Sequence, residues 1–362
     1  MGLVHDVARL EARAHGQAGG GEVLARLPFG VVGGPTLDAR RATRGPCNDP
    51  SGIVTVLRIV MVVNAFASSV TARNTVVIHR ALSADNEVEI VETNRRGHAI
   101  RFAQDAARRG VDIVIGFGGD GTLNEVATGV AGTDTALAIL PGGSTNVFAR
   151  TLGMPNDPVP AVQLLARGIA ARDIRPIGLG HVNGRYFCFH TGIGYDAAVV
   201  REVERAAGVK RWLGHPLFIY ASVRTWLSKY DRSHPHFSVR TSESPSPVDG
   251  YFTIVLNTNP YTYLGNRPLD MSPAATLDRG LVAVTFKTLK VGAVLGALAG
   301  ALRGGGMTPS KTVDVQTDLS CLTVSSSQPF PFQLDGDYLG ETLELNFEHR
   351  PNAVKLVYPA SP

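Results

Sequence analysis

The sequence predicts an α/β fold in two parts: an N-terminal α/β domain and a β-rich, sandwich-like second domain, with a site in the cleft between them. The first observation is an alternation of apolar, β-branched runs with helical segments up to about residue 141, which is typical of βαβ units. The second is a change beyond about residue 175, where short strand-like segments are separated by turn-rich stretches.

The elements of the first domain follow that rhythm in order. Its first strand is expected in the nearly unbroken apolar run from Ile53 to Val63, which suits a strand buried on both faces of a parallel sheet. The other elements expected here are helices at about 71–83, 97–109 and 122–131, and strands at about 88–92, 112–117 and 136–141.

The second domain is predicted to be mostly β-structure with a few helices. Its expected strands are at about 185–190, 250–258, 281–287, 312–315 and 320–325, and its expected helices at 195–207, 216–230 and 290–303. The last helix contains an Ala/Gly/Leu-rich run, 291–302, that is too short to span a bilayer. We expect a helix packed under the sheet; a lipid-facing surface is the alternative.

Composition narrows the class of protein. The 362 residues are 44% hydrophobic and 18% charged, as in a globular protein, and the formal net charge of +4 favours approach to polyanions without choosing among them. Cys47, Cys188 and Cys321 show no CxxC spacing, so the sequence predicts neither a disulfide framework nor a zinc site, and a reducing cytoplasm is expected. No apolar run approaches the roughly 20 residues of a membrane-spanning helix, so any membrane contact is expected to be peripheral.

Two glycine-rich loops carry the strongest local signal. The run Gly116–Glu125 and the run Pro141–Arg150 each join an apolar strand to a helix. Loops of this kind present backbone N–H groups and the positive end of a helix dipole to an anion such as phosphate. Consecutive crossover loops of a parallel sheet converge at one edge, where ligands bind in open α/β sheets. The alternative is that the glycines only make tight turns.

Four ordered motifs then become recognisable. The run GGDGTLNE at Gly118–Glu125 resembles the GGDGT motif of the diacylglycerol kinase catalytic family, which extends to sphingosine and ceramide kinases and, more distantly, to NAD kinases. Gly143–Asn146 resembles the GTxNDFAR segment, Thr191–Ala197 the GxGxDA segment, and Asp335–Asp337 the late DGE/DGD motif. The resemblance covers most of residues 55–358.

The resemblance implies a division of labour along the chain. It implies an α/β nucleotide-binding kinase domain at 54–178, to which a final strand near 353–358 returns, and a β-rich lipid-substrate domain at 179–350. Residues 1–52 are rich in Ala, Gly and Arg and show no sustained alternation, so they are expected to form a flexible extension.

The resemblance also implies ATP and Mg²⁺ as cofactors. Metal binding would fall to Asp120 and to Asp278, which is the acidic residue left in a magnesium-binding segment where Arg279 stands in place of a second aspartate. Two further departures are Asn64-Ala-Phe-Ala-Ser in place of Asn-Pro-x-x-Gly, and Val147 in place of an aspartate. The residues implied to bind the nucleotide and its phosphates are Asn64, Gly118, Gly119, Asp120, Gly121, Thr122, Glu125, Gly143, Ser144, Asn146 and Asp337.

Three acidic residues are the candidates for chemistry. Phosphoryl transfer needs a held γ-phosphate, a divalent metal and a carboxylate that deprotonates the attacking hydroxyl. The resemblance implies that Asp335 is this base, that Asp120 is catalytic and meets the phosphates through magnesium, and that Asp196 touches the lipid head group. The alternatives are a β-turn aspartate at Asp335, a helix N-cap at Asp120, and a turn or cap at Asp196.

The resemblance as a whole implies an ATP-dependent lipid kinase that phosphorylates the hydroxyl of diacylglycerol or a similar lipid. Such an enzyme would be cytoplasmic, would contact the inner face of the membrane peripherally, would bind no nucleic acid, and could form a homodimer. A sphingoid-base kinase or an NAD kinase is the first alternative. A non-catalytic nucleotide- or lipid-binding regulator on the same scaffold is the second, because Val147, Arg279 and the altered Asn64 segment depart from the family pattern.

Overall fold

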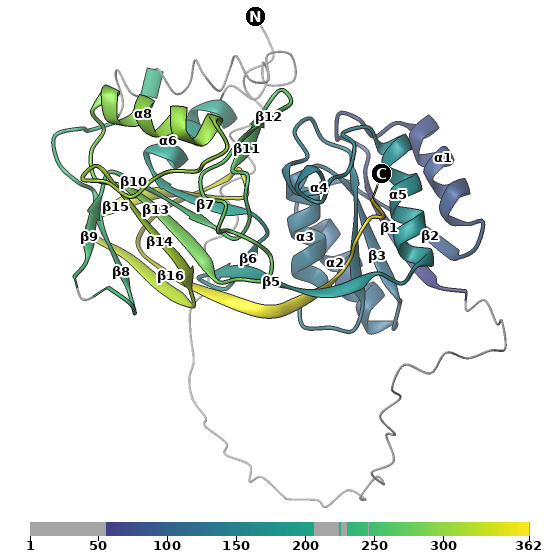
Figure 1. The fold of residues 1–362 in the computed structure, drawn as a ribbon. Helices are drawn as coiled ribbons and strands as arrows, with labels where there is room; N and C mark the ends of the chain where they lie inside the picture. The colour runs from purple at the N-terminus through teal and green to yellow at the C-terminus, as the bar shows by residue number, and fades with distance from the viewer. Residues whose placement is uncertain (1–55, 206–223, 226–229, 245, 362) are drawn as a thin grey trace, which may run out of the picture. The chain divides into compact units, whose positions relative to one another are not determined.

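The computed structural model describes residues 56–205, 224–225, 230–244 and 246–361 (Figure 1). Residues Val54–Pro362 form one compact unit, and the domain boundaries predicted within it stay a prediction. The expected extension at 1–52 lies outside the described residues, as does most of the expected helix at 216–230.

The N-terminal part is a parallel sheet with helices on both faces. Strands β1 to β4 pair in parallel in the order β4-β3-β1-β2. Helices α1 and α5 lie on one face of this sheet and α2 and α3 on the other (Figure 1). The elements are β1 (Arg58–Asn64), α1 (Ala72–Leu82), β2 (Glu87–Thr93), α2 (His98–Arg108), β3 (Ile113–Gly118), α3 (Asp120–Val130), β4 (Ala136–Pro141), α4 (Val147–Thr151) and α5 (Pro158–Ala170).

The apolar runs of the sequence explain which strands are central. Every residue of β3 and β4 is buried, and so are five of the seven residues of β1. Their side chains form one hydrophobic core with the inner faces of the helices. Covered on both faces, these strands have little need of polar residues, which is why they read as continuous apolar runs.

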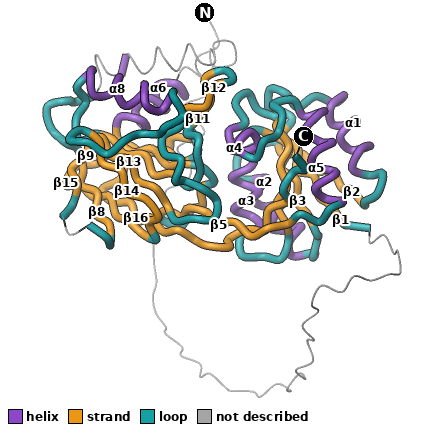
Figure 2. Tube along the Cα trace, viewed as in Figure 1, coloured by secondary structure: helices purple, strands orange, loops and turns teal. Residues whose placement is uncertain are grey.

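The second part is dominated by strands, which Figure 2 draws in orange, and most of their pairings are antiparallel. Helices α6 and α8 lie on one side of these strands (Figure 1). The elements are β5 (Ile174–Val182), β6 (Arg185–Phe187), β7 (His190–Gly194), α6 (Tyr195–Arg205), β8 (Phe237–Thr241), β9 (Val248–Gly250), β10 (Phe252–Leu256), β11 (Thr262–Leu264), β12 (Arg267–Leu269), β13 (Leu281–Phe286), α8 (Val291–Leu302), β14 (Val313–Leu319), β15 (Cys321–Leu334) and β16 (Asp337–Val357).

The long strand β16 links the two sets of strands. Its first residues pair with β15 in an antiparallel hairpin, and later residues pair with β5. Its end runs parallel to β4, with Lys355 opposite Ala136 and Leu356 opposite Leu137. One hydrogen-bonded path therefore runs through both parts in the order β14-β13-β10-β7-β15-β16-β4-β3-β1-β2.

The predicted fold class is confirmed: an N-terminal α/β part precedes a β-rich part. The structure differs from the sequence expectations in detail. Helix α3 begins at Asp120 instead of near residue 122, and helix α5 and strand β5 were not foreseen. The expectation for α8 was only partly right: Val294, Ala297 and Leu298 pack on the core, but Ala301 is its only buried residue. No described helix is long and apolar enough to cross a membrane.

Candidate functional site

Three loops meet at the carboxyl ends of β1, β3 and β4. The Ser69 N–H donates to the Gly142 carbonyl over 2.8 Å, and the Gly142 N–H donates to the Gly118 carbonyl over the same distance. The end of β1 is also joined to the start of α3, which follows β3. The Asn64 side-chain amide donates to the Thr122 hydroxyl over 2.9 Å. The convergence expected at this edge of the sheet is therefore present in the structure.

The two glycine-rich loops pack backbone against backbone. A Cβ atom added to Gly142 would lie 2.7 Å from the Gly118 Cα, and one added to Gly143 would lie 2.8 Å from the Gly119 Cα. Both distances are shorter than real Cβ contacts, so a side chain at either position would push the loops apart. The glycines here are required by close approach between two loops.

Helix α3 begins directly at this junction. Its N-cap is Gly119, which supplies no side-chain hydrogen bond to the first turn. The first four N–H groups of a helix lack intrahelical partners, and the aligned peptide dipoles place partial positive charge there. Gly121 is exposed in this first turn and Ser144 is exposed on the neighbouring loop, whereas Thr122 is buried.

Asp120 ties the first loop to the second. Its carboxylate oxygens accept hydrogen bonds from the N–H groups of Val147 and Phe148 at 3.1 and 3.3 Å, which caps the short helix α4. Burial raises the pKa of Asp120, and these two hydrogen bonds partly offset the rise. Each carboxylate oxygen keeps a free lone pair, so capping does not exclude contact with a cation.

Glu125 and Asn146 hold backbone in place. Glu125 accepts hydrogen bonds from the N–H groups of Gly97 and Ala99 at 2.8 and 3.0 Å, and so caps the start of α2. Asn146 has a left-handed backbone (φ 48°), and its side chain both accepts from and donates to the backbone of Gly143 over 2.8 Å. The structure places both residues beside the glycine loops in structural roles.

Asp335 occupies the two-residue turn of the β15–β16 hairpin. Asp335 and Gly336 both have positive φ, 47° and 87°, as the tight turns of hairpins require. The Asp335 carboxylate accepts three backbone hydrogen bonds, from Cys188 at 2.7 Å and from Phe189 and His190 at 3.0 Å. Asp335 is therefore the turn aspartate that was expected as an alternative. Its carboxylate is also fixed in place by three backbone hydrogen bonds.

The surroundings of Asp335 raise the pKa of its carboxyl group. Burial raises the pKa of Asp335 to about 7, although the hydrogen bonds from Cys188, Phe189, His190 and Asn124 favour the ionised form. A carboxylate of this pKa can take up and release a proton near neutrality, as a general base must.

Asn124 connects the first glycine loop to this carboxylate. From helix α3, its side-chain amide donates to the Asp335 Oδ2 over 2.8 Å and to the Tyr186 carbonyl over 2.9 Å. Asn124 lies inside the motif of the first loop but was not among the residues expected to act. Its role could not be found from sequence, because its partner Asp335 lies in a hairpin turn 211 positions further along the chain.

Asp337 lies close to the same helix. Its Oδ1 accepts from the guanidinium of Arg96 over 3.0 Å, and its Oδ2 lies 3.7 Å from a Cβ built on Gly121. The Asp335–Asp337 turn therefore approaches α3 through two acidic residues. Arg96, which follows β2, is a second member of the site that the sequence did not indicate.

Asp196 belongs to a buried polar network beside the turn. It accepts from the Tyr261 hydroxyl and, over 2.9 Å, from the side-chain amide of Gln333. The Gln333 side-chain oxygen accepts from the Gly336 N–H over 2.8 Å, so the network reaches the hairpin turn. Burial raises the pKa of Asp196 despite these bonds. The neighbouring His190 ring lies 4.3 Å from that of Tyr261, and burial lowers its pKa to about 3.

The two acidic residues implied to hold metal, Asp120 and Asp278, have different surroundings. Asp278 is exposed, and its pKa is lowered chiefly by the Thr276 hydroxyl. Over the described ranges, no three His, Cys, Asp or Glu residues are placed to hold a metal ion. Magnesium often binds through one or two carboxylates plus substrate phosphates. Asp120 and Asp337 beside the loops fit an ion that arrives with a nucleotide, not an all-protein cage.

Comparison with known proteins places the chain in a family. Residues 58–182 match the model of the diacylglycerol kinase catalytic domain. A protein named probable lipid kinase YegS-like from Xanthomonas campestris pv. campestris is 30% identical over 69% of this chain and 80% of the relative. One of the same name from Pseudomonas aeruginosa is 31% identical over 76% of this chain and 86% of the relative.

A solved structure shows the same fold. The crystal structure of a diacylglycerol kinase from Bacillus anthracis str. Sterne superposes with a TM-score of 0.61 at 20% identity, covering 83% of this chain and 96% of that one. Its similarity to these relatives defines the chain as a protein of a kinase family. It belongs to the diacylglycerol kinase catalytic-domain family, together with the YegS-like lipid kinases.

Proposed function

We propose that this protein is an ATP-dependent lipid kinase that phosphorylates the hydroxyl of diacylglycerol or a similar lipid at a membrane surface. The observation that carries the proposal is the placement of Asp335: a buried carboxylate with a pKa of about 7, held by three backbone N–H groups and by Asn124 from the helix of the first glycine loop.

In the proposed reaction Asp335 is the general base. Its two oxygens already accept four hydrogen bonds, so one of these must give way before Asp335 takes the proton of the lipid hydroxyl. The hydroxyl oxygen then forms a bond to the γ-phosphorus while the bond to the β–γ bridging oxygen breaks and ADP leaves. Proton transfer by a positioned side chain contributes typically about 10² to 10⁴ in rate. Asn124 and the three N–H groups orient the carboxylate, and Gln333 fixes the turn through Gly336.

The proposed nucleotide site is the junction of the glycine loops. The close backbone packing of Gly118 with Gly142 supports it, as does the N-terminus of α3, which offers N–H groups and a positive dipole to phosphate. Gly121 and Ser144 are exposed there and are the proposed direct contacts. Asn64, Thr122, Glu125 and Asn146 support the loops through the hydrogen bonds already described.

Magnesium bound with the phosphates would offset their negative charge. Asp120 and Asp337 are the residues proposed to hold it, from the first loop and from the hairpin turn. Asp278 is exposed, and we propose it for a separate, structural magnesium site.

The test is transfer of labelled phosphate from ATP to diacylglycerol, monoacylglycerol, sphingosine and NAD in mixed micelles with magnesium. Wild type is compared with Asp335→Asn, because asparagine tolerates the left-handed backbone of this position. Asp318→Asn is the matched control: Asp318 is another aspartate at positive φ, exposed and outside the site.

We expect lipid product with wild type and Asp318→Asn, and a loss of at least about 100-fold with Asp335→Asn at unchanged ATP affinity. Product with sphingosine alone would show a sphingoid-base kinase, and product with NAD alone would show an NAD kinase. Binding of ATP without transfer to any acceptor would overturn the kinase proposal in favour of a non-catalytic regulator.

A further inference from the structure

Helix α8 carries an exposed apolar stripe. The side chains of Val291, Leu295 and Leu302 are 56%, 59% and 44% exposed. Their spacing of four and seven residues places them on one side of the helix, in line with Leu298. Leu298 is partly buried against the core of the second part, so it anchors the inner edge of the stripe.

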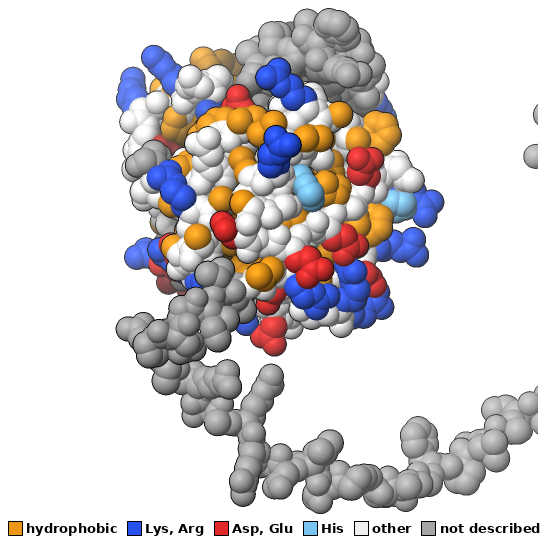
Figure 3. Space-filling view, turned by 90° about the vertical axis from the view of Figure 1, so that its right-hand side faces the viewer, with side chains coloured by type: hydrophobic (Ala, Val, Ile, Leu, Met, Phe, Trp, Pro, Cys, Tyr) orange, Lys and Arg blue, Asp and Glu red, His pale blue; other side chains and the backbone are white. Residues whose placement is uncertain are grey.

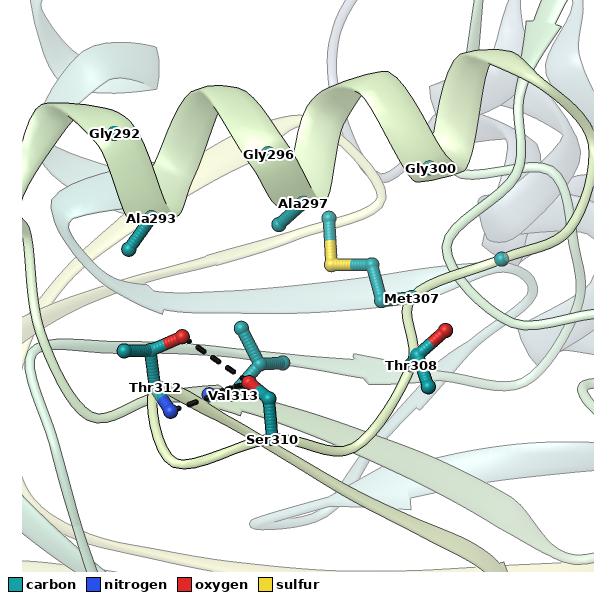
Figure 4. Close-up of a pocket in the computed structure, with 11 residues that line it drawn as sticks. Gly292, Ala293, Gly296, Ala297, Gly300, Met307, Thr308, Ser310, Thr312 and Val313 are labelled. Atoms are coloured by element: carbon teal, nitrogen blue, oxygen red, sulfur yellow. Dashed lines mark hydrogen bonds between the residues drawn. The ribbon is translucent and has the colours of Figure 1, made fainter.

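The small residues of α8 face a different direction. Gly292, Gly296 and Gly300 line a cavity of about 300 Å³ between the helix and the segment 306–313. Figure 4 shows Ala293 and Ala297 pointing toward that segment, where Ser310 and Thr312 lie. Val291, Leu295 and Leu302 do not line the cavity, so they are free to meet something outside the protein.

The charged residues of the segments that flank α8 in sequence are all basic. Between Gly280 and Val313 the chain has four basic residues and no acidic one; they are Lys287, Lys290, Arg303 and Lys311. Lys290 and Arg303 are the two caps of α8, and both are exposed, as is Lys311. Asp270 also lies near the end of the helix, with its carboxylate 3.5 Å from a Cβ built on Gly304, and it accepts a hydrogen bond from Asn259 over 3.0 Å.

The face on the side of α1, α5 and β2 is different. Figure 3 shows basic and acidic side chains interspersed on that face, with apolar side chains scattered among them. Such a surface attracts neither an anionic nor a cationic partner as a whole. The combination of an apolar stripe with basic ends therefore sets α8 apart from that face.

We propose that α8 is the surface by which this protein docks on an anionic lipid bilayer. Val291, Leu295 and Leu302 would enter the boundary between head groups and acyl chains, and Lys290 and Arg303, at the two ends of the helix, would contact lipid phosphates. Interfacial helices combine an apolar face with basic residues in this way, and each Lys or Arg near an anionic surface strengthens binding. The inference rests on the proposed function, because a lipid kinase must meet its substrate in a bilayer.

A second copy of the chain is the weaker choice of partner. If two α8 helices packed antiparallel about a two-fold axis, Lys290 of one copy would lie against Arg303 of the other. Like charges placed opposite each other at an interface disfavour association. An anionic bilayer instead complements both ends of the helix.

Binding to vesicles tests the surface without any kinase assay. The full chain is sedimented with vesicles of phosphatidylglycerol and phosphatidylcholine, and with vesicles of phosphatidylcholine alone, in the absence of ATP. We expect Leu295→Ser to weaken binding to the anionic vesicles by about tenfold, because it removes a leucine side chain that the bilayer would bury. Leu343→Ser is the matched control, because Leu343 is 51% exposed on β16 and lies outside α8.

Charge is tested separately. The pair Lys290→Gln and Arg303→Gln should weaken binding to anionic vesicles by at least about tenfold and leave the weaker binding to neutral vesicles unchanged. Leu295→Trp should show greater quenching by brominated lipid than Leu343→Trp, because only the first would enter the bilayer. This gain of signal does not depend on a variant losing function.

The outcomes separate this inference from the proposed function. Both α8 variants should keep wild-type transfer to a short-chain, water-soluble diacylglycerol, whereas wild type without such transfer counts against the kinase and not against the surface. Unchanged vesicle binding in Leu295→Ser and in the charge pair would overturn the inference. So would a Leu295→Ser variant that changes only the oligomeric state in sedimentation, since the stripe would then contact a second copy.

Discussion

The side-chain amide of Asn124 donates to the Asp335 carboxylate over 2.8 Å, across 211 positions of sequence. Through this bond the helix that begins at the first glycine loop positions the acid proposed to deprotonate the lipid. The same amide also donates to the Tyr186 carbonyl, so its orientation is fixed from two sides. The proposed base and the proposed phosphate site are thus coupled through one side chain.

The first prediction concerns pH. Because the proposed base acts only when ionised and its pKa is about 7, kcat/KM should rise tenfold per unit below that pH and level off above it. Asn124→Ala removes a hydrogen bond that favours the ionised form, so the rising limb should move to higher pH, by about one unit. A pH profile with a soluble acceptor measures this shift.

The control for that shift is Asn86→Ala, which removes an amide that donates to the Leu82 carbonyl instead. Its limb should stay near that of wild type. An Asn124→Ala profile that loses rate at every pH without moving would contradict the coupling between Asn124 and the acidity of Asp335.

The second prediction concerns the packing of the glycine loops. Gly142→Ala places a Cβ 2.7 Å from the Gly118 Cα, so the loops must separate. We expect a loss of about 1–3 kcal/mol in the free energy of unfolding, as for other overpacked sites, together with weaker ATP binding. Urea denaturation and calorimetric titration with ATP measure the two effects.

Gly296→Ala serves as the comparison for Gly142→Ala. A Cβ at Gly296 meets nothing within 4 Å, and the position lies in the middle of helix α8. Alanine there should stabilise the protein by about 0.5–1 kcal/mol and leave ATP binding unchanged. Equal ATP affinity in Gly142→Ala and wild type would count against the loop junction as the nucleotide site.

The third prediction separates two roles of Glu125. The family resemblance implies contact with the nucleotide, whereas the carboxylate in the structure accepts from Gly97 and Ala99. Glu125→Gln turns one acceptor into a donor that faces an N–H group, so the free energy of unfolding should fall by about 1–2 kcal/mol with ATP affinity unchanged. Glu92→Gln, at an exposed position of β2, should change neither quantity.

The fourth prediction concerns the buried Asp196. The Tyr261 hydroxyl donates to its carboxylate, and that bond matters most when the carboxylate is ionised. Burial raises the folded-state pKa of Asp196 above its usual 3.8, so the cost of Tyr261→Phe should grow as pH rises through the folded pKa. We expect about 1–3 kcal/mol lost from the free energy of unfolding at mildly alkaline pH and less at acidic pH.

Tyr186→Phe is the appropriate control, because Tyr186 contacts Asn124 through its main-chain carbonyl, which the substitution keeps. Urea denaturation at the two pH values gives the comparison. If Tyr261→Phe lowers the free energy of unfolding equally at both pH values, the Tyr261 hydroxyl contributes through packing and not by stabilising the charge of Asp196.

Much of the fold could be predicted because its strands are buried on both faces. The runs at β1, β3 and β4 read as strands from composition alone, and the glycine loops that follow two of them fixed the edge where they meet. Helix α8 could be located but its exposure could not. Its Gly, Ala and Leu residues suit a buried helix and a surface helix equally, and only the structure shows which side is covered.

Motif residues could be named from sequence, but their contacts could not. Glu125 and Asn146 stand in the recognised motifs, yet their side chains bond to nearby backbone. Arg96 and Gln333 stand outside the segments singled out for the site, and they reach it because β16 and β15 bring the hairpin turn to α3. Contacts between segments that are far apart depend on strand pairing, which local patterns do not specify.

The course of β16 has a consequence for how the chain folds during synthesis. The edge of β4 stays open until Lys355 and Leu356, which lie far downstream of β4 in the chain, can pair with it. An open edge is a template for pairing with other chains, so a ribosome-bound chain holding only the α/β part should be the most aggregation-prone stage. Completion of both parts by one late strand should also make them unfold in a single transition.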